Sequence, residues 1–142
     1  MSNYPTKIPR ETDITLVKTV LPRTQVYEPG GPYYVQGISA TSYEYNFAKA
    51  LDFIGMTYYF QVQFNTGRRS SGGFVLDFLL NTTPLQTPVF IDEEYWHKDA
   101  ERDEWQEDLL TRMKTYNKSR RFIFRDVGTP EAALSTVRMN FL

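Results

Sequence analysis

The chain has 142 residues and a formal net charge of -1, and 41% of its residues are hydrophobic and 15% aromatic. That length and apolar content fit one folded domain and exclude wholesale disorder. The sequence has no cysteine and a single histidine, His97. A disulfide framework, a thiolate nucleophile, a structural zinc site with cysteine ligands and a polyhistidine metal site are therefore excluded.

Prolines are concentrated at the start of the chain, where five of the eight fall within the first 32 residues. Because proline breaks helices, only the apolar stretch from Ile14 to Leu21 is expected to form a strand there. We interpret residues 1–37 as an extended arm, suited to packing, to contact with a protein partner or to self-association. Residues 38–142 are expected to form the folded domain.

An amphipathic helix and three strands are predicted next. Thr41 to Glu44 has the form of a capping box, and Gly55 ends an apolar pattern of helical spacing. β-Branched and aromatic residues then predict strands over 57–64, 74–80 and 88–92, with a turn rich in Gly, Ser and Arg between the first two.

A second helix is predicted from Asp99 to about Lys114, where Trp105, Leu109 and Met113 form one apolar stripe. Residues 121–126 are typical of a strand, and Thr129-Pro130-Glu131 is typical of a helix start. The predicted fold is an α/β domain with a small mixed sheet and flanking helices.

Charge is distributed unevenly along the chain. Residues 92–108 contain nine acidic residues against two basic ones, whereas residues 109–125 contain six basic residues and no acidic one. Such a layout can steer a polyanion onto one face, but two solvated helix faces would give the same pattern.

Asp77 is the only polar residue in the apolar run 74–80. Burying an ionised carboxylate costs on the order of several kcal/mol of folding free energy unless it is paired or ligates a cation. One interpretation is an arginine partner, from Arg68, Arg69 or Arg125. The other is a metal ion, because Asp92 ends the next apolar strand and carboxylates at adjacent strand ends can converge on one hard cation.

Two further residues have both structural and chemical interpretations. A lone histidine such as His97 is usually structural, but beside two carboxylates it can take a proton from a metal-bound water. Glu44 is explained equally well by the capping box and by a role in the same site.

These residues resemble the PD-(D/E)XK nuclease superfamily, and most closely its very-short-patch repair endonuclease branch. The resemblance covers about residues 38–127 and depends on the helix with Glu44, the strand with Asp77 and the Tyr-Trp-His97 turn. It implies a restriction-endonuclease-like core of helix, three strands, helix and strand, which holds Mg²⁺, with Mn²⁺ as an alternative.

The resemblance also implies roles for individual residues. Asp77 matches the metal-binding aspartate and Ile91 the residue whose carbonyl binds the metal. Glu44 matches the helix glutamate, His97 the general-base histidine and Asp103 the late aspartate.

The sequence departs from the superfamily at its Glu-x-Lys motif. Phe90 occupies the glutamate position, which the repair branch also fills with apolar or aromatic residues. Asp92 occupies the lysine position, where that branch has a histidine, and this suggests a direct or water-mediated metal contact instead. The zinc site of that branch cannot form without cysteines.

The implied function is a Mg²⁺-dependent DNA endonuclease or nickase that leaves a 5'-phosphate. Phosphate contacts are expected from basic side chains: Arg68, Arg69, Lys98, Lys114, Lys118, Arg120 and Arg121. The alternative is a catalytically silent nuclease fold that serves as a structural or interaction module of a phage particle or nucleoprotein assembly. The sequence contains no nucleophile elbow, P-loop or dinucleotide fingerprint, which argues against a small-molecule hydrolase.

Location is inferred from what the sequence lacks. No apolar run approaches the ~20 residues that a membrane helix requires, and the N-terminus has no signal-peptide pattern. We expect a cytoplasmic protein without membrane contact, and a phage or a mobile element is a candidate source of it.

Overall fold

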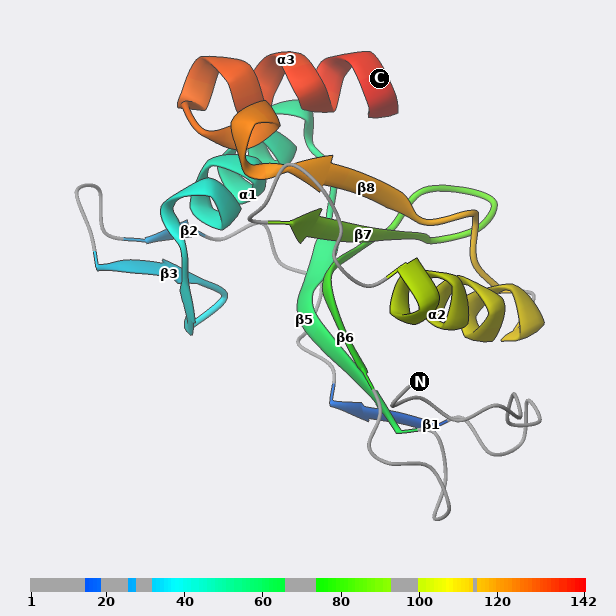
Figure 1. Ribbon diagram of the computed structural model, residues 1–142. Helices are drawn as coiled ribbons and strands as arrows, with labels where there is room; N and C mark the ends of the chain where they lie inside the picture. Colours follow the sequence, from blue (N-terminus) through cyan, green and yellow to red (C-terminus); the bar gives the residue numbers. More distant parts are fainter. Residues whose placement is uncertain (1–14, 19–25, 28–31, 66–73, 93–99, 114) are drawn as a thin grey trace.

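The computed structural model describes residues 15–18, 26–27, 32–65, 74–92, 100–113 and 115–142 (Figure 1). Within these ranges the α-helices are α1 (Ser42–Ile54), α2 (Ala100–Met113) and α3 (Pro130–Phe141), and a 3-10 helix, η2 (Phe124–Val127), precedes α3. The strands are β1 (Thr15–Lys18), β2 (Val26–Tyr27), β3 (Tyr33–Val35), β4 (Ile38–Ala40), β5 (Tyr58–Asn65), β6 (Phe74–Leu80), β7 (Thr87–Asp92) and β8 (Arg120–Ile123). From α1 onward the order of helices and strands is the predicted one.

A five-stranded mixed sheet forms the centre, in the order β1-β5-β6-β7-β8. All neighbouring strands in it are antiparallel except β7 and β8, which are parallel. The smaller sheet, β2-β3-β4, is antiparallel. The chain is thus a mixed α/β fold, which confirms the predicted class.

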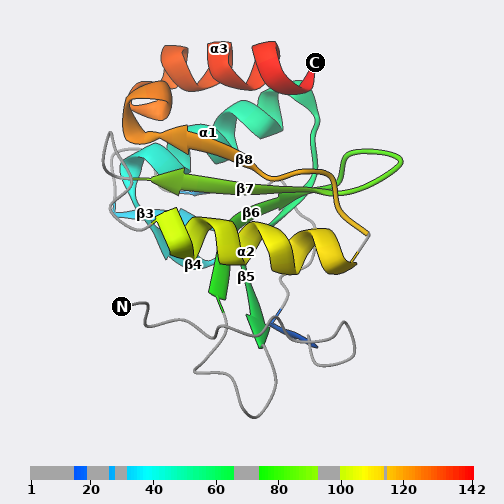
Figure 2. The same ribbon diagram turned by 45° about the vertical axis from the view of Figure 1, so that its right-hand side comes forward.

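Helices cover both faces of the central sheet. One cluster of buried residues, including Phe47 of α1 and Val137 of α3, packs on one face. A second cluster, including Trp105 and Leu109 of α2, packs on the other. Figure 2 shows α2 across the front of the sheet, and α1 and α3 stacked above β8.

The start of α1 confirms the predicted capping box. The Thr41 Oγ1 accepts a hydrogen bond of 3.2 Å from the Glu44 N–H, and the Thr41 N–H donates one of 2.9 Å to Glu44 Oε1. Gly55 ends the helix with a φ of 76°, a conformation that glycine adopts without a steric penalty. The helix boundaries were therefore encoded locally.

The segment before α1 also contributes to the fold. β1 pairs with the far half of β5. Gln36 and Gly37, both with positive φ, join β3 to β4, as a two-residue hairpin turn requires. The Gln36 side chain donates a hydrogen bond of 2.9 Å to the Tyr58 carbonyl and accepts one of 3.2 Å from the Phe60 N–H. A side-chain amide thus takes the place of a neighbouring strand along this part of β5.

The predicted strand over residues 121–126 was too long. β8 ends at Ile123, and η2 follows. The Asp126 carboxylate accepts a hydrogen bond of 3.1 Å from the Ile123 N–H, which closes a tight turn instead of extending the strand. Thr129 then caps α3, as predicted.

The central sheet changes direction at one position. Phe60 packs with α1 and α3, whereas Val62, two residues further along β5, belongs to the α2 cluster. Residues two apart normally share a face. Gln61, between them, has a φ of 54°, and the register on both sides places it opposite Asp77 of β6. The strained backbone at Gln61 therefore lies directly opposite Asp77, where the buried face of β5 changes from one side of the sheet to the other.

Candidate functional site

Asp77 lies where β6 and β7 separate. Their pairing ends at Phe78 and Val89, and beyond that pair the Asp77 Oδ2 accepts a hydrogen bond of 2.7 Å from the Ile91 N–H. The side chain thus fills the gap in the backbone ladder. In Figure 1, β6 runs steeply and β7 crosses it almost horizontally, as such a separation requires.

The electrostatic setting of Asp77 favours its protonated form. Burial is the largest effect, and it raises the pKa of Asp77 from 3.8 to about 7. The Ile91 N–H lowers the pKa, the charges of Glu44 and Asp92 raise it, and the Arg121 guanidinium lowers it. Loss of solvent is therefore the main cause of the raised pKa, and the neighbouring charges adjust it further.

Glu44 has the capping role predicted from the sequence, and its role in a catalytic site stays a prediction. It is a buried residue that completes the capping box of α1, and its charge acts on Asp77. The helix start therefore fixes a carboxylate beside the strand with Asp77. Its cap explains why the side chain stays in place, and its charge explains part of the pKa shift.

A second charged group centres on Arg121 of β8. Its guanidinium lies 3.3 Å from an Asp103 oxygen and 3.9 Å from an Asp92 oxygen, and it donates 3.2 Å to Gln106. It also lies 4.1 Å from the centre of the Phe90 ring. The three charged side chains are only about one-fifth exposed, so solvent screens these contacts weakly.

We call Glu44, Asp77, Asp92, Asp103 and Arg121 the carboxylate cluster. Four of the five predicted catalytic residues belong to it, brought together from α1, β6, β7 and α2. Ile91, the predicted carbonyl donor, contributes its N–H to Asp77. Within the described ranges, no three Asp, Glu or His side chains meet around a single metal position.

Other predicted residues lie elsewhere. His97, the fifth predicted catalytic residue, falls outside the described residues, as do four predicted phosphate contacts: Arg68, Arg69, Lys98 and Lys114. Lys118 and Arg120 line a pocket at the opposite end of β7 from Asp92.

Sequence reasoning missed the position of Arg121. It was grouped with the phosphate-binding residues, and the arginine partners suggested for Asp77 were Arg68, Arg69 and Arg125. The signal was its place in β8, opposite Phe90 in the parallel pairing with β7. Strand alternation sends Arg121 toward α2 and its neighbour Arg120 toward α3.

Comparison of the chain with protein-family models, with curated proteins and with solved structures found no match. No helix in the described parts of the chain has the length and apolar character that crossing a membrane requires.

Proposed function

We propose that this protein is a Mg²⁺-dependent DNA endonuclease or nickase, and that the carboxylate cluster is its active site. The observation that carries the proposal is Asp77, a carboxyl held in the gap between two strands with its pKa raised to about 7. Strongly perturbed groups beside specific charge partners are typical of functional sites. The helix and strand order also agrees with the restriction-endonuclease-like core that the resemblance implies.

The residues present fit a magnesium ion. Mg²⁺ is usually bound by one or two carboxylates, with water and substrate phosphate completing its octahedron, so three converging acids are not required. Asp77 and Asp92 would supply the carboxylates. Because the N–H and C=O of one residue point to the same edge of an extended strand, the Ile91 carbonyl would face the same gap. Mn²⁺ would suit the same oxygen ligands.

The bound cation would polarise the scissile phosphate and lower the pKa of a water molecule. Asp77 would have to be ionised to bind it, so the raised pKa predicts weak cleavage below neutral pH. Glu44, fixed by the helix cap, would add negative potential. In this proposal His97 accepts a proton from the water, a role that comes from the resemblance alone.

Arg121 would hold the acidic side of the site in place. Its contacts to Asp92 and Asp103 would orient two partly buried carboxylates. Its stacking on Phe90 explains how the chain places a positive charge near the site although the Glu-x-Lys motif is missing.

One observation favours the second candidate, a silent nuclease fold that serves as a structural or interaction module. Arg121 already neutralises part of the cluster through Asp92 and Asp103. A group balanced by its own arginine needs less help from a metal ion. In this alternative the cluster stabilises the junction of α2, β7 and β8, and has no catalytic role.

A plasmid-nicking assay with Mg²⁺ or Mn²⁺ tests the proposal. We expect wild type to convert supercoiled plasmid to nicked or linear forms, and Asp77→Asn to lose at least about 100-fold of that rate, the loss typical of a key electrostatic group. The matched control is Asp108→Asn, an exposed acid on α2, which should cut like wild type. Undiminished cleavage by Asp77→Asn would remove the assigned site, and no cleavage by wild type would favour the structural module.

A further inference from the structure

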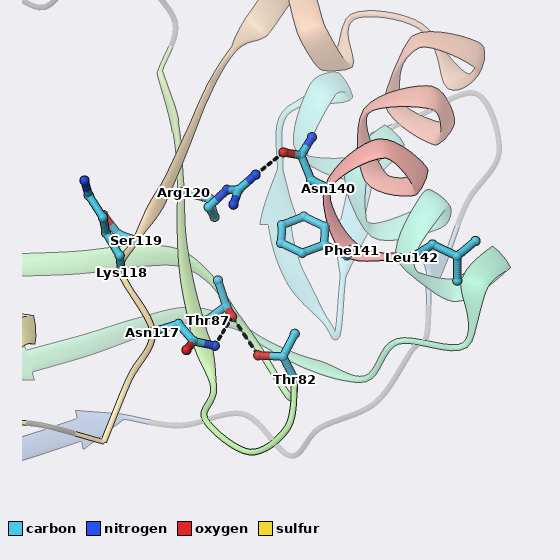
Figure 3. A pocket seen from close by; sticks show the side chains of 9 residues that line it. All are labelled: Thr82, Thr87, Asn117, Lys118, Ser119, Arg120, Asn140, Phe141 and Leu142. Carbon is cyan, nitrogen blue, oxygen red and sulfur yellow. Dashed lines mark hydrogen bonds between the residues drawn. The ribbon is translucent and has the colours of Figure 1, made fainter.

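A pocket of about 530 Å³ lies between the start of β7, the segment leading into β8 and the end of α3. Figure 3 shows Arg120 joined to Asn140 on one side, Thr82, Thr87 and Asn117 on the opposite side, and Phe141 between them. The pocket lies on the opposite side of β8 from the carboxylate cluster, because Arg120 contacts Asn140 of α3 whereas the adjacent Arg121 contacts Gln106 of α2. It is therefore a second and separate feature.

The pocket carries positive charge. Lys118 and Arg120 line it, and no acidic side chain of the described residues does. Glu107 accepts from Ser119 at one edge but is not part of the wall. An anionic ligand would meet two cationic side chains in this wall and no acidic one.

Arg120 is oriented by neutral groups. Its guanidinium donates to the Asn140 side-chain oxygen and lies 5.8 Å from the centre of the Phe141 ring. Among the described residues no carboxylate pairs with it. An arginine that is held in place but keeps its full charge is suited to binding a phosphate in a bidentate manner.

The opposite wall is a fixed polar network. The Thr82 and Thr87 hydroxyl groups are 2.6 Å apart and hydrogen-bonded. The Asn117 side-chain amide donates a hydrogen bond of 3.0 Å to the Thr87 hydroxyl and one of 2.9 Å to the Leu85 carbonyl. Phe141 adds an aromatic surface, itself held edge-on against Phe122. Polar groups on one wall and a ring beside a cation on the other match a planar base joined to a phosphate.

We propose that this pocket binds a nucleoside phosphate, either as a free nucleotide or as the phosphorylated end of a nucleic-acid strand. The phosphate pairs with Arg120 and Lys118, and the base lies against Phe141. The volume is within the range of ordinary small-molecule sites. The proposal does not depend on the proposed nuclease activity, because no residue of the carboxylate cluster lines the pocket.

Titration calorimetry of the full chain tests this, with dAMP, adenosine and inorganic phosphate as probes. We expect saturable binding of dAMP, weaker binding of phosphate and no binding of adenosine. Arg120→Gln and Lys118→Gln should each weaken dAMP binding about tenfold, the effect of one charge-assisted contact. Lys118 is exposed, so its variant tests charge without disturbing packing. Arg112→Gln, an exposed arginine on α2, is the control and should bind like wild type.

A short single strand with and without a 5'-phosphate distinguishes the two sources of the ligand. Tighter binding of the phosphorylated strand than of dAMP identifies a strand end, and the reverse identifies a free nucleotide. Equal dAMP binding by wild type and both variants, binding of adenosine as tight as dAMP, or no saturable binding of either phosphorylated probe would overturn the proposal. Asp77→Asn should bind dAMP normally, so this outcome is separable from that of the nuclease proposal.

Discussion

The Asp77 carboxylate accepts a hydrogen bond of 2.7 Å from the Ile91 N–H at the point where β6 and β7 part. A side chain thus satisfies a backbone donor that the separating strand no longer can. The same contact holds the carboxylate in a buried position, where burial raises its pKa most and the charges of Glu44, Asp92 and Arg121 shift it further. The hydrogen bond between Asp77 and Ile91 therefore both completes the backbone pairing and fixes the position of the carboxyl group whose pKa is raised.

Stability should depend on the protonation of Asp77. Its pKa is raised from 3.8 to about 7, so the folded state retains a proton that the unfolded state releases. The contribution to stability is complete below about pH 4 and is lost as pH rises through about 7. Asp77→Asn, which cannot ionise, should be more stable than wild type at pH 8, by about 1 kcal/mol or more, and should lose that advantage at pH 4.

Thermal or urea unfolding across this pH range measures the effect. Asp108→Asn is the control, because that exposed acid on α2 lies outside the cluster. A constant difference between Asp77→Asn and wild type from pH 4 to pH 8 would contradict the assigned pKa.

Glu44→Gln separates the two roles of Glu44. Glutamine can complete a capping box as glutamate does, so α1 should keep its start, and the variant removes only the charge. Because the Glu44 charge raises the pKa of Asp77, the pKa should fall in this variant. Carboxyl-carbon NMR titration of Asp77 measures it. An unchanged pKa would show that Glu44 does not act on Asp77.

Arg121→Gln should destabilise the fold by roughly 1–3 kcal/mol, because Asp92 and Asp103 lose the cation that pairs with them. The pKa of Asp77 should rise further, since the Arg121 charge lowers it. Arg112→Gln provides the matched control on an exposed position. Urea unfolding and the same titration give both results, and wild-type values for each would refute the role assigned to Arg121.

Gln36→Ala should cost about 1–3 kcal/mol, because it leaves the Tyr58 carbonyl and the Phe60 N–H without their side-chain partner. Hydrogen exchange of the Phe60 amide should accelerate. Asparagine at this position tolerates the positive φ, but its side chain is one methylene shorter. Gln36→Asn therefore tests whether the length of the side chain, and not the backbone conformation, protects the Phe60 amide. Slow exchange of Phe60 in both variants would mean that the Gln36 amide does not protect this edge of β5.

The sequence predicts features that depend on neighbouring residues. The start of α1 depends on Thr41 and Glu44, three residues apart, and its end on the adjacent Gly55. Asp77 stood out because it interrupts an apolar run. Asp126 also acts locally, on Ile123, so its tight turn could have been predicted from an acidic residue two positions before Gly128.

Long-range partners were not predictable in the same way. Gln36 reaches Tyr58 across 22 residues, and no local pattern distinguishes it from an ordinary turn residue. The place of Arg121 depends on the parallel register of β8 with β7, and a shift by one residue would have put Arg120 in the cluster instead. The catalytic roles of Glu44, Asp77, Asp92, His97 and Asp103 remain predictions.

The most direct test of the central claim is the titration of the Asp77 carboxyl carbon with and without Mg²⁺. Without the ion we predict a pKa of about 7. Saturating Mg²⁺ should lower this pKa by at least about one unit, because a divalent cation favours the ionised form. The carboxyl-carbon chemical shift of the exposed Asp108 should not respond to the added Mg²⁺. A pKa of Asp77 that is the same with and without Mg²⁺ would contradict the assignment of this residue as the metal ligand.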